Sequence, residues 1–164
     1  MYPDFKELLS VLNEHHVKYL VVGAYAVAIH AQPRATKDMD ILVKPDVENA
    51  NAVFEALVEF GAPLGRLTAA DFVEPGPFFQ MGNAPIRVDI LTDIPGIDFN
   101  IAWEHRIVDV VDPETGLKAN FISAADLITS KLASGRLQDL ADVEAIRNAE
   151  KSVRAKPKEG GSNH

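Results

Sequence analysis

The sequence predicts an α+β fold in which a mixed β-sheet is flanked by helices. Three observations support this prediction. Short apolar or alternating segments, typical of β-strands, are spread along the chain. Segments with apolar residues at helical spacing lie between and after them rather than in one separate block. Glycines and prolines stand at most of the boundaries between these segments.

The start of the chain alternates between predicted helices and strands. Pro3 suits the first turn of a helix, which we expect to end near residues 15–16. A buried strand over 18–22 follows and stops at Gly23. A tightly packed helix of small apolar residues is then expected over 24–31.

A second strand is predicted over 38–43, and Pro45-Asp46 opens another helix. Gly61 is expected to cap the C-terminus of this helix, where a left-handed residue is common. The predicted apolar stripe of the helix consists of Val47, Ala50, Phe54, Leu57 and Val58.

Two strand pairs are expected in the second half. They are 78–81 with 86–91, turned at Gly82-Asn83, and 106–111 with 117–121. The segment 63–77 gives no clear pattern, and 97–105 is ambiguous but would fit a short helix.

Helices are predicted to close the fold. Ser123 is the expected N-cap of a helix that runs to about Ser134. A last helix carries the apolar residues Leu140, Val143 and Ile146. We expect one domain over residues 1–150 and a flexible tail over 151–164, whose final part is rich in glycine and charge.

Composition excludes several classes of protein. The chain has no cysteine, which excludes disulfides, thiolate metal sites and a cysteine nucleophile. No apolar run approaches the ~18 residues of a membrane span, and the N-terminus lacks a signal-peptide layout, so a cytoplasmic location is expected. The net charge of -8 argues against general binding of polyanions.

An Asp-x-Asp pair begins the strand predicted over 38–43. Asp38 and Asp40 lie two residues apart, so their side chains share one face of the strand. Neighbouring carboxylates repel each other, and one of them would normally take up a proton. Because Mg²⁺ prefers carboxylate oxygens together with water and substrate phosphates, a metal–phosphate site would remove that conflict.

A third acid is predicted on the strand over 86–91. Asp89 falls on its polar face together with Arg87, while the alternate residues are apolar. Three convergent carboxylates can hold two metal ions, which would carry a triphosphate and activate an attacking hydroxyl. Asp89 would then be the general base or a ligand of the hydroxyl-activating metal. The alternative is a solvated Asp89 that pairs only with Arg87.

The turn at Gly23-Ala24 precedes a predicted helix. The N-terminus of a helix presents backbone N–H groups to phosphate, and glycine allows close approach. This signal is weak alone, because a tight turn needs glycine whether or not phosphate binds. The Asp pair that follows about fifteen residues later makes it stronger.

Together these residues resemble the signature of the nucleotidyltransferase superfamily, whose fold is shared with DNA polymerase beta. Gly23, Asp38, Asp40 and Asp89 match that signature. The R-x-T-x-D-x-D string that begins at Arg34 and the stretch 126–140 resemble a bacterial branch that includes toxins of toxin–antitoxin and abortive-infection systems. The resemblance covers roughly residues 18–147.

The resemblance implies site residues beyond the three acids. Lys131 would reach the nucleotide phosphates, Arg34 and Thr36 would take part in nucleotide binding, and Arg136 with Asp139 would lie near the cleft. Ala24 departs from the usual serine or glycine, so a hydroxyl contact to phosphate would be missing. The alternative interpretations, without a functional role, are that Thr36 is a turn former, that Lys131 is solvated, and that Asp139 and Asp142 face water.

The resemblance implies an Mg²⁺- or Mn²⁺-dependent enzyme that moves a nucleoside monophosphate from an NTP, such as ATP, to an acceptor hydroxyl. The acceptor would be a tRNA or other RNA end, a protein or a small molecule, and an antitoxin protein is a candidate partner. One alternative is a non-catalytic subunit that binds nucleotide and metal. Another is a structural, antitoxin-like partner. The sequence contains no H-E-x-x-H, G-x-S-x-G or P-loop lysine motif.

Overall fold

The computed structural model describes residues 1–33, 36–75, 78–82 and 87–155. Within this part of the chain, the strands form one six-stranded sheet in the order β3-β4-β2-β1-β6-β5. The strands are β1 (Tyr19–Val22), β2 (Asp38–Val43), β3 (Phe78–Met81), β4 (Arg87–Leu91), β5 (Ile107–Asp112) and β6 (Leu117–Phe121). The pairs β1/β6 and β2/β4 are parallel and the others are antiparallel, so the predicted mixed sheet is confirmed.

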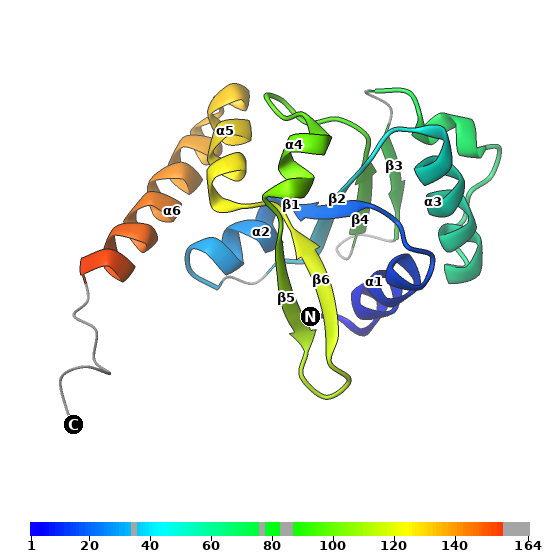
Figure 1. Ribbon diagram of the computed structural model, residues 1–164, viewed down its shortest axis with the longest axis horizontal. Helices are drawn as coiled ribbons and strands as arrows, with labels where there is room; N and C mark the ends of the chain where they lie inside the picture. Colours follow the sequence, from blue (N-terminus) through cyan, green and yellow to red (C-terminus); the bar gives the residue numbers. More distant parts are fainter. Residues whose placement is uncertain (34–35, 76–77, 83–86, 156–164) are drawn as a thin grey trace.

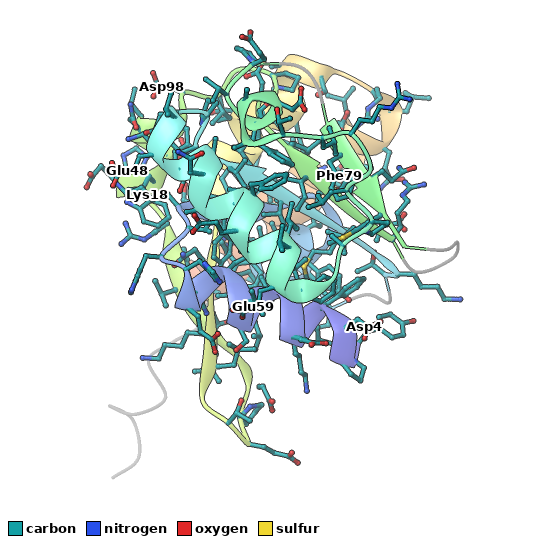
Figure 2. The ribbon with its side chains drawn as sticks, turned by 90° about the vertical axis from the view of Figure 1, so that its right-hand side faces the viewer. Asp4, Lys18, Glu48, Glu59, Phe79 and Asp98 are labelled. Carbon is teal, nitrogen blue, oxygen red and sulfur yellow. The ribbon has the colours of Figure 1, made fainter. Side chains whose placement is uncertain are left out.

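Helices cover the sheet on both sides (Figure 1). They are α1 (Pro3–Glu14), α2 (Gly23–His30), α3 (Val47–Phe60), α4 (Phe99–Glu104), α5 (Ala124–Ser134) and α6 (Leu137–Ala155), with a 3₁₀ turn η1 (Ala69–Phe72). Helices α1 and α3 pack together on one side, while α5 and α6 form a hairpin on the other. The view from the α3 side shows Glu59 at the end of that helix, where its carboxylate lies 3.2 Å from His15 Nε2 of α1 (Figure 2).

The two faces of the central strands differ in burial. On β2, Met39 and Ile41 are fully buried in the core, while Asp38 and Asp40 are half-buried on the other face. Strand β4 repeats the alternation, with Val88 and Ile90 buried. The core therefore fixes the register of the acidic face, since a slip by one residue would turn the carboxylates into the core.

The apolar stripe predicted for α3 is partly wrong. Val47 and Val58 are 67% and 57% exposed, whereas Val53 and Ala56 are fully buried. The helical period places both exposed valines outside the face formed by Ala50, Val53 and Leu57. The C-terminal helix shows the same error at one position, because Leu140 is 46% exposed while Val143 and Ile146 are buried.

The segments that the sequence left open contain short elements. Residues 97–105 include α4, and the Asp98 side chain caps it by accepting hydrogen bonds from the N–H groups of Asn100 and Ile101. Residues 63–77 contain η1, which begins with a reciprocal capping box between Thr68 and Asp71. These elements are short and are stabilised by local capping. They therefore contain too few turns to show the repeated apolar spacing by which a longer helix is predicted from sequence.

The C-terminal helix is longer than predicted. It continues through Ala155, so residues 151–155 are helical, and the remainder of the predicted tail, 156–164, lies outside the described residues. None of the described helices is both long enough and apolar enough to cross a bilayer.

Candidate active site

The three predicted acids lie on adjacent strands. In the parallel pairing of β2 with β4, Asp40 stands directly opposite Asp89, and Asp38 stands opposite Arg87. Residues in register on neighbouring strands point to the same face. The structure therefore brings Asp40 and Asp89 together, with Asp38 beside them along β2.

The carboxylates of this cluster oppose each other's ionisation. Burial, followed by the charge and hydrogen bond of Asp89 and the charge of Asp38, raises the pKa of Asp40 to about 6. In the described part of the chain, no group of three or more acidic or histidine side chains has the geometry of a metal-binding site. The strained pair is nevertheless of the type that a divalent cation relieves, because cation binding replaces the shared proton.

Two further side chains contact the acids. Gln80 on β3 donates a hydrogen bond from Nε2 to Asp89 Oδ1 over 3.0 Å. Arg87 approaches Asp89 Oδ1 with Nε at 3.4 Å and Asp38 Oδ2 with Nη2 at 3.7 Å. Gln80 was not predicted as a site residue, although the predicted hairpin contained the signal: the antiparallel register puts Gln80 directly opposite Asp89.

Gly23 brings the start of α2 against the acids. Its φ of +64° is a left-handed conformation, and a Cβ at this position would overlap the Asp40 carboxylate. No side chain caps the first turn of α2, whose N-cap is Val22. The first N–H groups of the helix, including that of Ala24, are therefore free of side-chain capping next to Asp40, as the phosphate-binding prediction requires.

A methyl group at Gly23 is expected to disrupt the site more than the fold. Gly23→Ala should cost about 1–2 kcal/mol of stability from its left-handed backbone and should also displace Asp40. Gly116→Ala is the matched control, since φ is +74° there and a Cβ at this position would meet no described atom within 4 Å beyond the adjacent residues. Thermal unfolding should show similar losses for both variants, while titration with nucleotide and Mg²⁺ should show weakened binding for Gly23→Ala only. Equal nucleotide binding by the two variants would contradict this account.

Thr36 supports the strand rather than projecting freely into the site. Its hydroxyl donates to the Asp38 carbonyl oxygen over 3.2 Å, and the Asp38 N–H lies 3.4 Å from the same hydroxyl. The Tyr25 hydroxyl of α2 donates to the Thr36 carbonyl oxygen. These contacts tie the loop before β2 to α2. The other predicted loop residue, Arg34, lies outside the described residues.

Lys131 on α5 enters an ion-pair network with α6. Its Nζ lies 2.9 Å from Asp142 Oδ2 and 3.4 Å from Asp139 Oδ1. Arg136 Nε contacts Asp139 at 2.8 Å, and its hydrogen bond holds the pKa of Asp139 below the usual range. The expectation that Asp139 and Asp142 face water is wrong, because they are only 2% and 3% exposed. The cationic side chains replace water as their partners, a pairing that the three-residue spacing alone does not reveal.

One pocket lies between the acidic face of the sheet and the α5–α6 hairpin. It has a volume of about 150 Å³ and is lined by Gly23 and Asp40 from one side and by Ser130, Lys131 and Arg136 from the other. Ser130 is buried and was missed, because a serine within a helix gives no sequence signal. A larger hollow of about 590 Å³ lies between α1, the end of α3 and the β3–β4 hairpin, but neither Asp38 nor Asp40 lines it. The smaller pocket is thus the one that combines acids, a helix N-terminus and cations.

Comparison with known proteins identifies the family and the fold. The model of a family described as nucleotidyltransferase of unknown function (DUF6036) matches residues 4–149. No curated protein matches the chain. Several solved structures match the chain, and two of them share the fold over most of its length. A Thermotoga maritima protein assigned as a nucleotidyltransferase has a TM-score of 0.50 and 17% identity, over 93% of this chain and 91% of that one. The lincosamide antibiotic adenylyltransferase LnuA, solved with lincomycin bound, has a TM-score of 0.53 and 15% identity, over 91% of this chain and 98% of that one.

Proposed function

We propose that the chain, which belongs to this family of nucleotidyltransferases, transfers a nucleoside monophosphate from an NTP to an acceptor hydroxyl, with release of pyrophosphate. The observation that carries the proposal is the direct register of Asp40 with Asp89 beside the glycine turn that opens α2. The same face carries Asp38, so the three predicted acids occupy one small area of the sheet.

The donor set fits a divalent metal ion. Asp38, Asp40 and Asp89 offer only carboxylate oxygens, which suit Mg²⁺ or Mn²⁺. Burial, followed by the neighbouring Asp89, raises the pKa of Asp40, and a cation would offset this cost of ionisation. When bound, the ion would neutralise the triphosphate and the charge that develops during displacement. Asp89, on the strand next to Asp40, would accept the proton of the attacking hydroxyl or orient that hydroxyl.

The nucleotide is proposed to enter from the side of α5. The N–H groups at Gly23 and Ala24 would donate to phosphate oxygens, and Lys131 with Arg136 would face the phosphates across the pocket. Ala24 offers its N–H but no hydroxyl. Thr36 would act indirectly by holding the backbone of Asp38.

We propose a small hydroxylated molecule as the favoured class of acceptor. A protein side chain and an RNA end are the other two classes. The fold neighbour LnuA is an adenylyltransferase of an antibiotic, which supports the first class, and the net charge of -8 disfavours a long nucleic acid. A role as the toxin of a toxin–antitoxin pair in the cytoplasm is a narrower form of the same proposal. It rests only on the resemblance of two segments, the string that begins at Arg34 and residues 126–140, to the bacterial branch that includes such toxins.

A pyrophosphate-release assay tests the proposal against the non-catalytic alternative. The purified chain is incubated with each NTP, Mg²⁺ or Mn²⁺, and panels of the three acceptor classes, beside the Asp38→Ala/Asp40→Ala variant. We expect acceptor-dependent pyrophosphate release that the double variant lacks. Nucleotide binding without release across all acceptors would favour a regulatory subunit. A folded chain without any nucleotide affinity would favour a structural partner.

A further inference from the structure

Arg87 lies among the acids of the candidate site. Its guanidinium approaches both outer carboxylates, with Nη2 3.7 Å from Asp38 Oδ2 and Nε 3.4 Å from Asp89 Oδ1. It also stands opposite Asp38 in the register of β2 and β4, so its side chain follows the acidic face. A fixed positive charge therefore occupies the area where a divalent cation would bind.

The two contacts of Arg87 are loose. Charge-assisted hydrogen bonds of a well-seated guanidinium are about 2.7–2.9 Å long. Both contacts here are longer, and Nε is buried without a hydrogen-bond partner among the described residues. The Arg87 side chain is also 40% exposed. By contrast, Lys131 reaches Asp142 at 2.9 Å with both side chains almost fully covered. Arg87 therefore balances charge without being locked in place.

We infer that Arg87 is the internal counter-ion of the acids and competes with the divalent cation until nucleotide phosphates offer its guanidinium another partner. This inference rests on the proposed function. A guanidinium forms two parallel hydrogen bonds with phosphate oxygens, which would replace its two long contacts. Metal and nucleotide would then bind cooperatively, and each would raise the affinity for the other by the same factor.

Removal of the charge should strengthen binding of metal alone. Even in a water-like dielectric, a unit charge about 5 Å from a divalent ion changes its affinity by roughly tenfold. Arg87→Gln keeps a polar side chain but removes the charge. We expect it to bind Mn²⁺ without nucleotide at least about tenfold more tightly than the wild type. The gain in Mn²⁺ affinity produced by nucleotide should shrink in the variant, because no competing charge is left to displace.

The test is a titration of the full chain with Mn²⁺, followed by water proton relaxation, in the presence and absence of α,β-methylene-ATP. Arg87→Lys, which keeps the charge, should bind Mn²⁺ in the absence of nucleotide like the wild type. Arg66→Gln, at an exposed position outside the strands that carry the acids, is the control for net charge. Thermal unfolding checks that each variant is folded. Tighter Mn²⁺ binding by Arg87→Gln alone supports the inference.

Two other outcomes would overturn the inference about Arg87, and only the second of them would also contradict the proposed function. If the wild type binds Mn²⁺ with nucleotide but Arg87→Gln shows equal or weaker Mn²⁺ affinity, Arg87 is not a competitor and the proposed function stands. If the folded wild type and all variants bind no Mn²⁺ with or without nucleotide, the metal site of the proposed function fails, and the inference fails with it.

Discussion

Replacing Asp142 with alanine is expected to destabilise the protein by about 3–5 kcal/mol, a range typical of breaking a buried ion pair. Asp142 is 3% exposed and holds Lys131 Nζ at 2.9 Å. Without it, the contact that Lys131 keeps among the described residues is the longer one to Asp139, which Arg136 already shares. Urea unfolding of the wild type and Asp142→Ala would measure the loss, since the two helices that form this hairpin meet at these charges.

A neutral replacement of both partners separates stability from function. Lys131→Met/Asp142→Leu removes both charges, while Asp139 keeps Arg136 at 2.8 Å. Apolar pairs often replace buried ion pairs at little cost, so the double variant should recover most of the lost stability. It should still bind nucleotide poorly, because Lys131 is gone. Wild-type nucleotide affinity in the double variant would show that Lys131 serves only the α5–α6 hairpin.

Replacing Asp40 with asparagine is expected to stabilise the metal-free protein at neutral pH while abolishing its activity. The folded-state pKa of Asp40 is raised from the ordinary value of 3.8 to about 6, so its ionisation opposes folding. A shift of this size corresponds to at most about 3 kcal/mol, and a gain of about 1–2 kcal/mol is expected after screening. Thermal unfolding in EDTA should show a higher midpoint for Asp40→Asn, by about 2–4 °C per kcal/mol for a chain of this size.

The pH dependence of that gain follows from the direction of the pKa shift. Below the pKa of the unfolded state, Asp40 is protonated in both the folded and the unfolded protein, so its ionisation does not destabilise the fold. The destabilisation grows between pH 3.8 and about 6 and is complete above pH 6. The difference in unfolding midpoint between Asp40→Asn and the wild type should therefore rise from near zero at pH 4 to its full size at pH 7. Asp93→Asn, at an exposed position, is the control. A difference that does not change with pH would contradict the assigned cause.

The placement of the acids could be predicted from the sequence because it depends on strand alternation. Asp40 and Asp89 each stand between buried apolar neighbours, and Asp38 lies two residues before Asp40, so a period of two residues puts the three acids on one face. Gly23 could be predicted for a similar reason, since a strand that runs directly into a helix needs a special backbone conformation.

Other features of the site depend on contacts between distant segments. The burial of Asp139 and Asp142 arises because α6 folds back onto Lys131 of α5, which helical spacing alone does not show. The contact of Gln80 with Asp89 depends on the exact register of the β3–β4 hairpin. Arg87 was predicted as a partner of Asp89, but its second contact, to Asp38, requires the parallel pairing of β2 with β4.

Calorimetric titration of the wild type and Asp40→Asn with ATP and each other NTP, with and without Mg²⁺, tests whether Asp40 belongs to a metal–nucleotide site. Asparagine keeps the size of the side chain at Asp40 and removes its charge, so any lost binding is due to the carboxylate. The proposed site predicts Mg²⁺-dependent binding of at least one NTP by the wild type and none by the stable, folded variant. No NTP binding by a folded wild type, or equal binding by both proteins, would contradict a metal–nucleotide site at Asp40 and Asp89.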